Sequence, residues 1–362
     1  MYATRARPQL VLVVLLVAIA TLVEPTGAHA HVKWFCGVID LRAPPKSLAT
    51  VLSPMFLTRA VAFLALVTLG TAIDAVLSRR WPRLDSGSSR LDFLEEIVVR
   101  LGLGAYMLSL CANLAVVPWG PATDGAIITP DLLVGTQVIR VVQFLIAACL
   151  VLRRTCPLAG FGIAGLYAFG LVRYGLFYMT DYVFFLGLAA YLILSLPNLR
   201  QRPSWHGWRV PILVASLAFS LMWTAIEKFL YPGWTDIVLA LYPSVAMGFP
   251  APFVTLTAGF VEFTLAFYLL VGHSLLRPGA FIFMSIFILA IPSFGILDAV
   301  GHLPIVAIFL VVIIHGTSRL QLLVRPQGTR AWRAAASVAG LYVGILIVQT
   351  AMYYGLQTTT WW

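Results

Sequence analysis

The sequence predicts an all-α protein that crosses a membrane about ten times. Of its 362 residues, 60% are hydrophobic and 10% are charged, and the mean hydropathy is +0.93. Soluble domains carry roughly 25% charged residues, so this chain cannot cover a water-facing surface and must place most side chains against lipid. The net charge of +10 does not indicate nucleic-acid binding, because the arginines fall in short clusters between apolar runs.

The first 30 residues are expected to be a secretory signal peptide. An apolar run over residues 10–23 is about fourteen residues long, short of the roughly 20 that a spanning helix needs. Ala28-His29-Ala30 supplies the small residues of a cleavage site. Cleavage after Ala30 leaves His31 first, and cleavage after Ala28 leaves His29 first. A retained segment would leave the rest of the topology unchanged.

Ten apolar segments follow and are expected to be transmembrane helices. They fall at about 53–77, 97–118, 131–152, 158–178, 182–197, 211–230, 251–272, 279–297, 303–318 and 334–356. Arginines occupy alternate loops, whereas the loops 119–130, 179–181, 231–250 and 298–302 hold no lysine or arginine. The positive-inside rule makes the arginine loops cytoplasmic and places both ends of the mature chain outside.

An internal duplication is expected, with a degenerate four-helix repeat at 96–200 and a second repeat at 208–320. Pro157 falls on Pro278 and Asp181 falls on His302 under the same shift of 121 residues. Both repeats would have the same orientation, so they would be parallel repeats. The segment 31–95, with the first mature span, and the segment 330–362, with the last, would flank the two repeats.

Ionisable residues within spans are costly and by default mark a function or a buried pair. The second repeat concentrates them. Glu227 lies near the outer end of its span, Glu262 near the middle of the next, and Asp298 and His302 at the outer hairpin. We expect catalytic roles for these four. Asp298 and His302 would alternatively only hydrogen-bond each other and cap a helix.

Three stretches, AIEKFLYPGW, GFVEF and DAVGHLPI, resemble the four-helix module of DoxX-like membrane proteins, whose namesake is a subunit of a thiosulfate:quinone oxidoreductase. The HVKWF segment after the signal peptide is similar to the start of a subgroup of bacterial membrane proteins with this module. The resemblance covers about 208–320 and, suggestively, 31–45. It implies a four-helix bundle in a bacterial inner membrane. It does not specify an activity, because the broader family is functionally mixed.

Polar residues of the first repeat are candidate partners or ligand-binding groups. Arg140 and Gln143 are three residues apart on one helix face. Arg140 would either pair with Glu262, whose other candidate partner is His302, or bind an anionic ligand together with Arg173. Such a ligand would be a quinone oxygen or a sulfur oxyanion. Arg173 would alternatively extend to the membrane surface.

The sequence also predicts a metal-binding site. A histidine at a free N-terminus offers its amine and its ring, a chelate that suits copper, and carboxylate and imidazole ligands suit several transition metals. His31, or His29 after the other cleavage, would supply this arm, and Asp298 and His302 would complete the site, with Glu227 and Glu262 as further candidate ligands. The alternative is that the histidine motif is only a cleavage site.

Three functions therefore follow from the sequence. The first is a quinone-linked oxidoreductase, or its membrane subunit working with another membrane or periplasmic redox subunit. The second is a copper-binding or metal-handling membrane protein. The third is a transporter or assembly factor, which the parallel duplication and the charges within spans would also fit.

Overall fold

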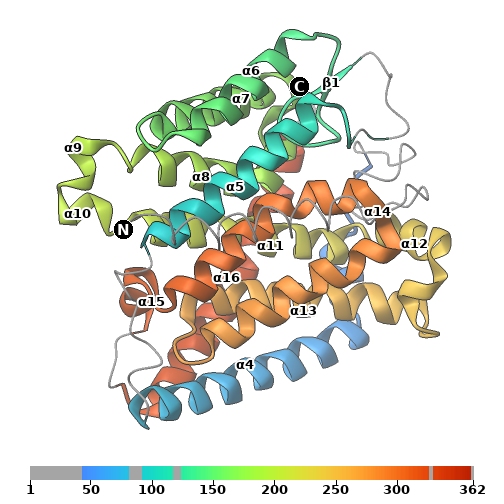
Figure 1. The fold of residues 1–362 in the computed structure, drawn as a ribbon. Coiled ribbons are helices and arrows are strands. Elements are labelled where there is room, and N and C mark those ends of the chain that lie inside the picture. The colour runs from blue at the N-terminus through green and yellow to red at the C-terminus, as the bar shows by residue number, and fades with distance from the viewer. Residues whose placement is uncertain (1–42, 81–91, 116, 118–123, 326–328, 360–362) are drawn as a thin grey trace.

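The protein is a bundle of long helices in a computed structural model that describes residues 43–80, 92–115, 117, 124–325 and 329–359 (Figure 1). Six of the described helices are long and apolar enough to cross a membrane. The expected all-α, multi-pass membrane fold is confirmed at this level. The predicted signal peptide and His31 lie outside the described residues.

The order of the elements follows the predicted spans closely. They are α3 (Leu48–Val51), α4 (Pro54–Arg80), α5 (Asp92–Cys111), β1 (Gly125–Ala126), β2 (Leu133–Val134), α6 (Val138–Val151), α7 (Cys156–Met179), η3 (Thr180–Tyr182), α8 (Phe184–Ile193), α9 (Pro197–Arg200), α10 (Pro203–His206), α11 (Arg209–Leu230), α12 (Pro232–Leu241), η4 (Pro243–Ala246), α13 (Ala251–Val271), α14 (Leu276–His315), α15 (Arg319–Val324) and α16 (Ala331–Thr359).

Helix α14 folds back on itself at Gly295. A straight helix would separate Phe283 from Phe309 by about 39 Å, yet their ring centroids lie 5.2 Å apart. Gly295 has φ 77° and ψ −160°, a conformation that glycine adopts readily because it has no Cβ. The two arms therefore form a hairpin (Figure 1). The predicted loop at 298–302 is wrong, since those residues are helical and the chain reverses three residues earlier.

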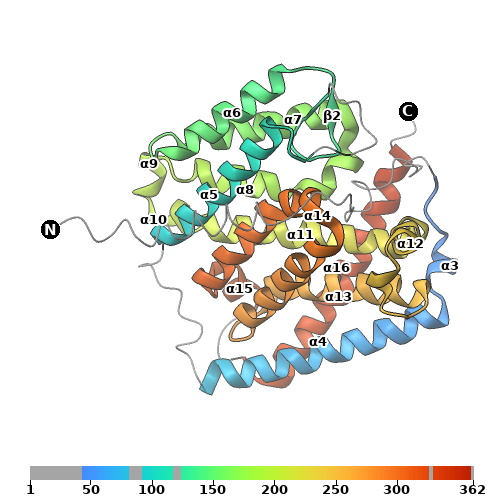
Figure 2. The same cartoon turned by 45° about the vertical axis from the view of Figure 1, so that its right-hand side comes forward.

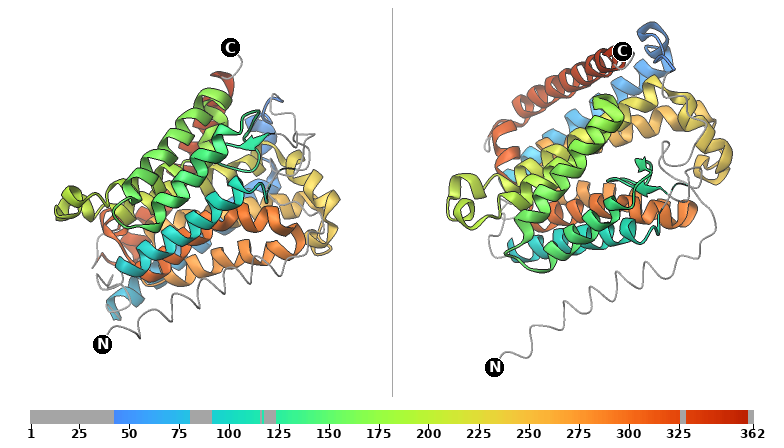
Figure 3. Two further views of the ribbon diagram at one scale, coloured as in Figure 1. Left: turned by 45° about the horizontal axis from the view of Figure 1, so that its top comes forward. Right: turned by 90° about the horizontal axis from the view of Figure 1, so that it is seen from above.

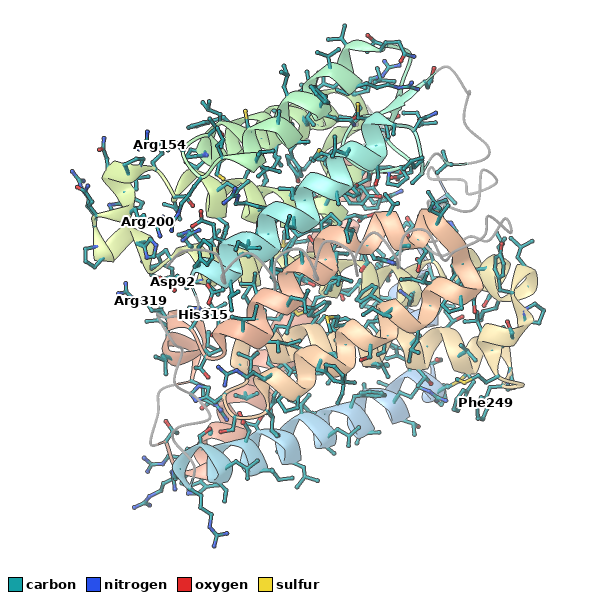
Figure 4. The ribbon with its side chains drawn as sticks, viewed as in Figure 1. Asp92, Arg154, Arg200, Phe249, His315 and Arg319 are labelled. Carbon is teal, nitrogen blue, oxygen red and sulfur yellow. The ribbon has the colours of Figure 1, made fainter. Side chains whose placement is uncertain are left out.

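The arginine-bearing loops gather at one end of the bundle, which we call the arginine end. Figure 4 shows Arg154, Arg200 and Arg319 there, whereas Phe249 marks the opposite, distal end. Side-chain contacts join these loops to neighbouring parts of the same end. Arg79 donates to the carbonyl of Thr329, and the Glu96 carboxylate lies within ion-pair distance of the arginines of two different loops. The alternation of charge along the sequence is therefore a real segregation of charge in space.

Helices α5–α8 and α11–α14 form two groups that pack reciprocally (Figure 2). The first helix of one group, α5, packs on α14, the last of the other, and α11 packs on α8. Small residues allow both approaches. A Cβ built on Gly102 of α5 would lie 2.7 Å from the Cβ of Ala307, and Gly187 of α8 lies equally close to Ser216. Close backbone approach at small residues is the usual packing device of membrane helices.

Helices α4 and α16, which flank the two groups in sequence, pack against each other along one face of the bundle (Figure 3). Aromatic rings tie them to the rest of the bundle. Phe56 of α4 contacts Phe229 of α11 at 5.3 Å, and Tyr353 of α16 stacks on Trp223 of α11 at 4.6 Å.

Part of the connection between α5 and α6 is buried, although loops usually lie on surfaces. Residues 125–132 are all buried, and β1 pairs with β2 in an antiparallel hairpin. Helix α6 therefore begins at Val138 rather than at 131, and the predicted span 131–152 is too long. The predicted span at 97–118 is displaced as well, because α5 begins at Asp92 and includes three acidic residues.

Asp74 is the polar anchor of the arginine end. Its carboxylate is fully buried on α4 and accepts hydrogen bonds from the backbone amides of His273 (2.9 Å) and Leu275 (2.7 Å). Arg325, also buried, forms an ion pair with the same carboxylate. One side chain thereby fixes α4 to the α13–α14 connection and to the end of α15.

We predict that Asp74→Ala destabilises the protein strongly, because it leaves the buried Arg325 guanidinium without its counter-charge. Loss of one partner of a buried pair costs about 3–5 kcal/mol of unfolding free energy. The measurement is the thermal midpoint in detergent. Asp236→Ala is the matched control, because the Asp236 carboxylate accepts a 3.2 Å bond from Thr255 and is only partly buried. Equal midpoints for the two variants would contradict the assignment.

Candidate functional site

Asp298 and His302 form a buried pair on the second arm of α14. The Nδ1 atom of His302 lies 2.9 Å from Oδ1 of Asp298, as their spacing of four residues on a helix allows. The imidazole rests against the Phe287 ring at 4.6 Å. Within the described residues, no group is positioned to donate a well-aligned hydrogen bond to either Asp298 oxygen.

The Asp298 carboxylate lies beside the imidazole and fixes the orientation of the ring. Burial of such a pair is costly when both groups are charged, since desolvation of two charges can exceed their mutual attraction. The sequence correctly placed the two side chains together, and the structure adds that both are withdrawn from the surface.

Glu262 pairs with Lys228 rather than with either predicted partner. Lys228 Nζ donates to Glu262 Oε2 at 2.7 Å, joining α11 to α13, and both side chains are partly buried. The expected pairing of Glu262 with Arg140 or His302 is wrong. The neighbour of Lys228 in sequence, Glu227, points elsewhere because adjacent helix positions do not share a face.

Glu227 belongs to what we call the distal cluster, made of Trp223, Glu227, Tyr353 and Asp181. Trp223 and Glu227 lie one helical turn apart on α11, Tyr353 comes from α16 and Asp181 from η3. The buried Tyr353 hydroxyl is within electrostatic range of both carboxylates. The Tyr353 hydroxyl and the Trp223 indole N–H are both buried, and neither has a hydrogen-bond partner among the described residues.

Aromatic rings surround the distal cluster. Tyr353 stacks on Trp223, and Phe177 of α7 meets Tyr353 edge-on at 5.0 Å. Tyr231 and Trp234, at the junction of α11 with α12, stack at 4.2 Å, and Tyr231 lies 6.0 Å from Tyr353. The cluster therefore combines two buried carboxylates, two donors and flat apolar faces, drawn from both helix groups and from α16.

The first described residues run along the same end of the bundle. The amide of Lys46 donates to the Leu230 carbonyl at 3.0 Å, and the Ala43 carbonyl accepts from the Tyr231 hydroxyl at 3.1 Å. The Tyr354 hydroxyl donates to the Lys46 carbonyl. Residues 43–46 thus form a strap between the ends of α11 and α16, next to the distal cluster.

The predicted anion-binding residues of the first repeat lie on two helices. Gln143 is fully buried and donates to the carbonyls of Ala126 (2.5 Å) and Ile127 (3.2 Å), so it holds the buried hairpin in place. Arg140 lies in the first turn of α6, close to Gly125. Arg173 is exposed on α7. An anion site made of the two arginines therefore stays a prediction.

Asp131 is a buried carboxylate that the sequence reasoning missed. It accepts hydrogen bonds from the hydroxyls of Thr129 (2.6 Å), Tyr178 (2.6 Å) and Tyr182 (2.9 Å). Its position in a predicted span, directly after Pro130, was the available signal. Three hydroxyl donors satisfy the carboxylate, so it fixes the buried hairpin against α7 and η3.

Glu95 and Glu96 were also missed, because the predicted span began after them. Glu95 accepts from His315 Nδ1 at 2.9 Å. Glu96 lies 2.8 Å from Arg153, 3.6 Å from Arg200 and farther from Arg100. Both carboxylates are buried at the arginine end and connect α5 to three other segments, which hold His315, Arg153 and Arg200.

Within the described parts of the chain, no three histidine, cysteine, aspartate or glutamate side chains come together as metal ligands. Asp298 and His302 supply two of the three predicted ligands, and the third, His31, lies outside the described residues. Glu227 and Glu262 do not form a group of three with this pair.

No family model matches the chain, and no curated protein or solved structure matches it either. The DoxX-like resemblance therefore stays a prediction, and the function must be argued from the site itself.

We predict that the Asp298–His302 pair is strongly coupled. His302→Leu leaves a buried carboxylate alone and should lower the unfolding free energy by about 3–5 kcal/mol, whereas the double variant Asp298→Leu/His302→Leu should recover most of the loss. Thermal midpoints of the two single variants and the double variant form the cycle. Additive losses would show that the two groups do not interact.

Proposed function

We propose that the protein is the membrane subunit of a quinone-linked oxidoreductase and that the distal cluster binds the quinone ring. One observation carries the proposal: the Tyr353 hydroxyl and the Trp223 indole N–H are buried donors with no described acceptor. An unsatisfied buried donor costs about 1–3 kcal/mol. A ligand with two carbonyl oxygens, bound beside these donors, would offset that cost.

The chemistry of a quinone matches the remaining parts of the cluster. Its flat ring suits the aromatic faces of Trp223, Tyr353 and Phe177. Reduction to the quinol takes two electrons and two protons. Glu227 and Asp181 would supply the protons, and a redox partner protein would supply the electrons. Both carboxylates are buried within the same cluster as the two donors, so they lie where the ring would be reduced.

The Asp298–His302 pair lies on the second arm of α14, near its reversal. It would act as a second proton carrier, exchanging protons between the interior and the distal surface. Its buried imidazole is the side chain whose ordinary pKa is best matched to proton exchange near neutral pH.

The topology that goes with this proposal has ten crossings. They are α4, α5, α6, α7, α8, α11, α13, the two arms of α14, and α16. The arginine end would face the cytoplasm and the distal end the outside of a bacterial inner membrane. The reciprocal packing of α5 on α14 and α11 on α8 supports two parallel DoxX-like repeats.

We predict that Tyr353→Phe lowers quinone affinity about tenfold, because it removes one hydrogen-bond donor worth roughly 1–1.5 kcal/mol. Quenching of tryptophan fluorescence by a short-chain quinone gives the dissociation constant. Tyr342→Phe is the matched control, since Tyr342 is also buried on α16 but bonds Thr264 at 2.9 Å on the facing helix. Equal affinity in wild type and both variants would overturn the proposal.

A metal-binding function is the second candidate, and the strap favours it. The Ala43 carbonyl accepts hydrogen bonds from Tyr231 and Gln357 at the distal end. His31 precedes Ala43 by twelve residues in the sequence. That length of extended chain spans up to about 40 Å. The proposal requires that this length cover the separation between Ala43 and the Asp298–His302 pair.

If this second function holds, the purified mature protein contains about one copper, zinc or iron per chain, and both His31→Ala and His302→Ala remove it. The measurement is elemental mass spectrometry with N-terminal sequencing. His206→Ala, at the arginine end, serves as a control that should retain the metal. Metal-free wild-type protein with a histidine terminus would exclude this candidate.

A further inference from the structure

An open groove of about 540 Å³ runs between α5 and α6 on the outside of the bundle. Apolar side chains of α5 line it from Phe93 to Leu108, and Val151 closes it at the end of α6. Phe93, Leu108 and Val151 are exposed. Gly104 lies in the floor, where an added Cβ would meet no atom within 4 Å. The floor is therefore hollow because the residue there has no side chain.

The groove is longer than one leaflet of a membrane is thick. Phe93 and Leu108 are fifteen residues apart on α5, which corresponds to about 22 Å along the helix axis. One half of a hydrocarbon core is about 15 Å thick. An acyl chain that entered at the arginine end would lie in the groove along most of its length.

Positive charge gathers where the groove opens at the arginine end. Arg100 lines the groove and is held in place by the last carbonyls of α6, those of Leu150 (2.7 Å) and Val151. Arg153 and Arg154 follow α6 after Leu152, and Figure 4 shows Arg154 at the arginine end. Arg153 also pairs with Glu96, whereas Arg154 is exposed.

We propose that this groove is a binding site for one anionic diacyl phospholipid. An acyl chain fills the space over Gly104, and the phosphate group lies against Arg153 and Arg154 at the arginine end. Basic pockets between membrane helices on the cytoplasmic side bind anionic headgroups in this way. The inference does not depend on the proposed quinone site, which lies at the distal end and uses other helices.

Charge complementarity selects this occupant over a helix of another protein. A partner helix would need a continuous apolar face, whereas Arg100 lines the groove and Arg153 and Arg154 follow α6 within three residues of Val151. An anionic headgroup complements the exposed Arg154, and a flexible chain fits a narrow space better than a rigid helix about 10 Å wide.

The test is native mass spectrometry of the full-length protein, titrated with phosphatidylglycerol or with phosphatidylcholine of the same acyl chains. Wild-type protein is expected to retain one phosphatidylglycerol about tenfold more tightly than phosphatidylcholine. Gly104→Leu fills the floor with a better helix former and should lower phosphatidylglycerol affinity at least tenfold. Gly70→Leu on α4 is the matched control, because it too has open space and lies on another face.

Arginine variants test the headgroup separately. Arg154→Gln should remove most of the preference for phosphatidylglycerol while phosphatidylcholine binding stays the same, and Arg330→Gln, an exposed arginine at the same end, should change neither. Equal binding of the two lipids by wild type, or unchanged binding in Gly104→Leu, would overturn the proposal and indicate ordinary surrounding lipid. Loss of a bound quinone, with no loss of lipid, in Gly104→Leu would assign the groove to a quinone tail instead.

Discussion

The burial of carboxylates within an apolar bundle is the constraint on which this structure depends. A charge in a low-dielectric interior must find a counter-charge, a set of hydrogen-bond donors or a proton. Asp74 has both a counter-charge, Arg325, and two hydrogen-bond donors, which are backbone amides. Asp131 has three hydroxyl donors. Each solution joins segments distant in sequence, so the few charges of this chain define which helices become neighbours.

The two ends of the bundle use this constraint differently. At the arginine end, Glu95 and Glu96 meet histidine and arginine and act as structural anchors. At the distal end, Glu227 and Asp181 face a tyrosine hydroxyl within an aromatic surround. A structural role explains the first arrangement completely. The buried donors of Tyr353 and Trp223 form no hydrogen bond with the described residues. For this reason the distal end is the better place for a ligand.

Much of the fold could be predicted because hydropathy and arginine placement report directly on membrane crossing. The positions of the turns were harder to predict from the sequence. The reversal at Gly295 depends on one backbone conformation, and the burial of residues 125–132 depends on tertiary contacts such as those of Gln143. The pairing of Asp298 with His302 followed from helical spacing, whereas that of Glu262 with Lys228 joins two helices and left no local signal. Tyr353 was missed altogether, since an aromatic residue in a terminal apolar span is unremarkable in sequence.

Photoaffinity labelling with an azido-quinone, followed by peptide mapping, tests the central claim most directly. The account predicts labelled peptides from the distal parts of α11 and α16, around Trp223 and Tyr353, and loss of the label when excess unmodified quinone is present. Label confined to other helices, or label that excess quinone does not displace, would contradict a quinone site at the distal cluster.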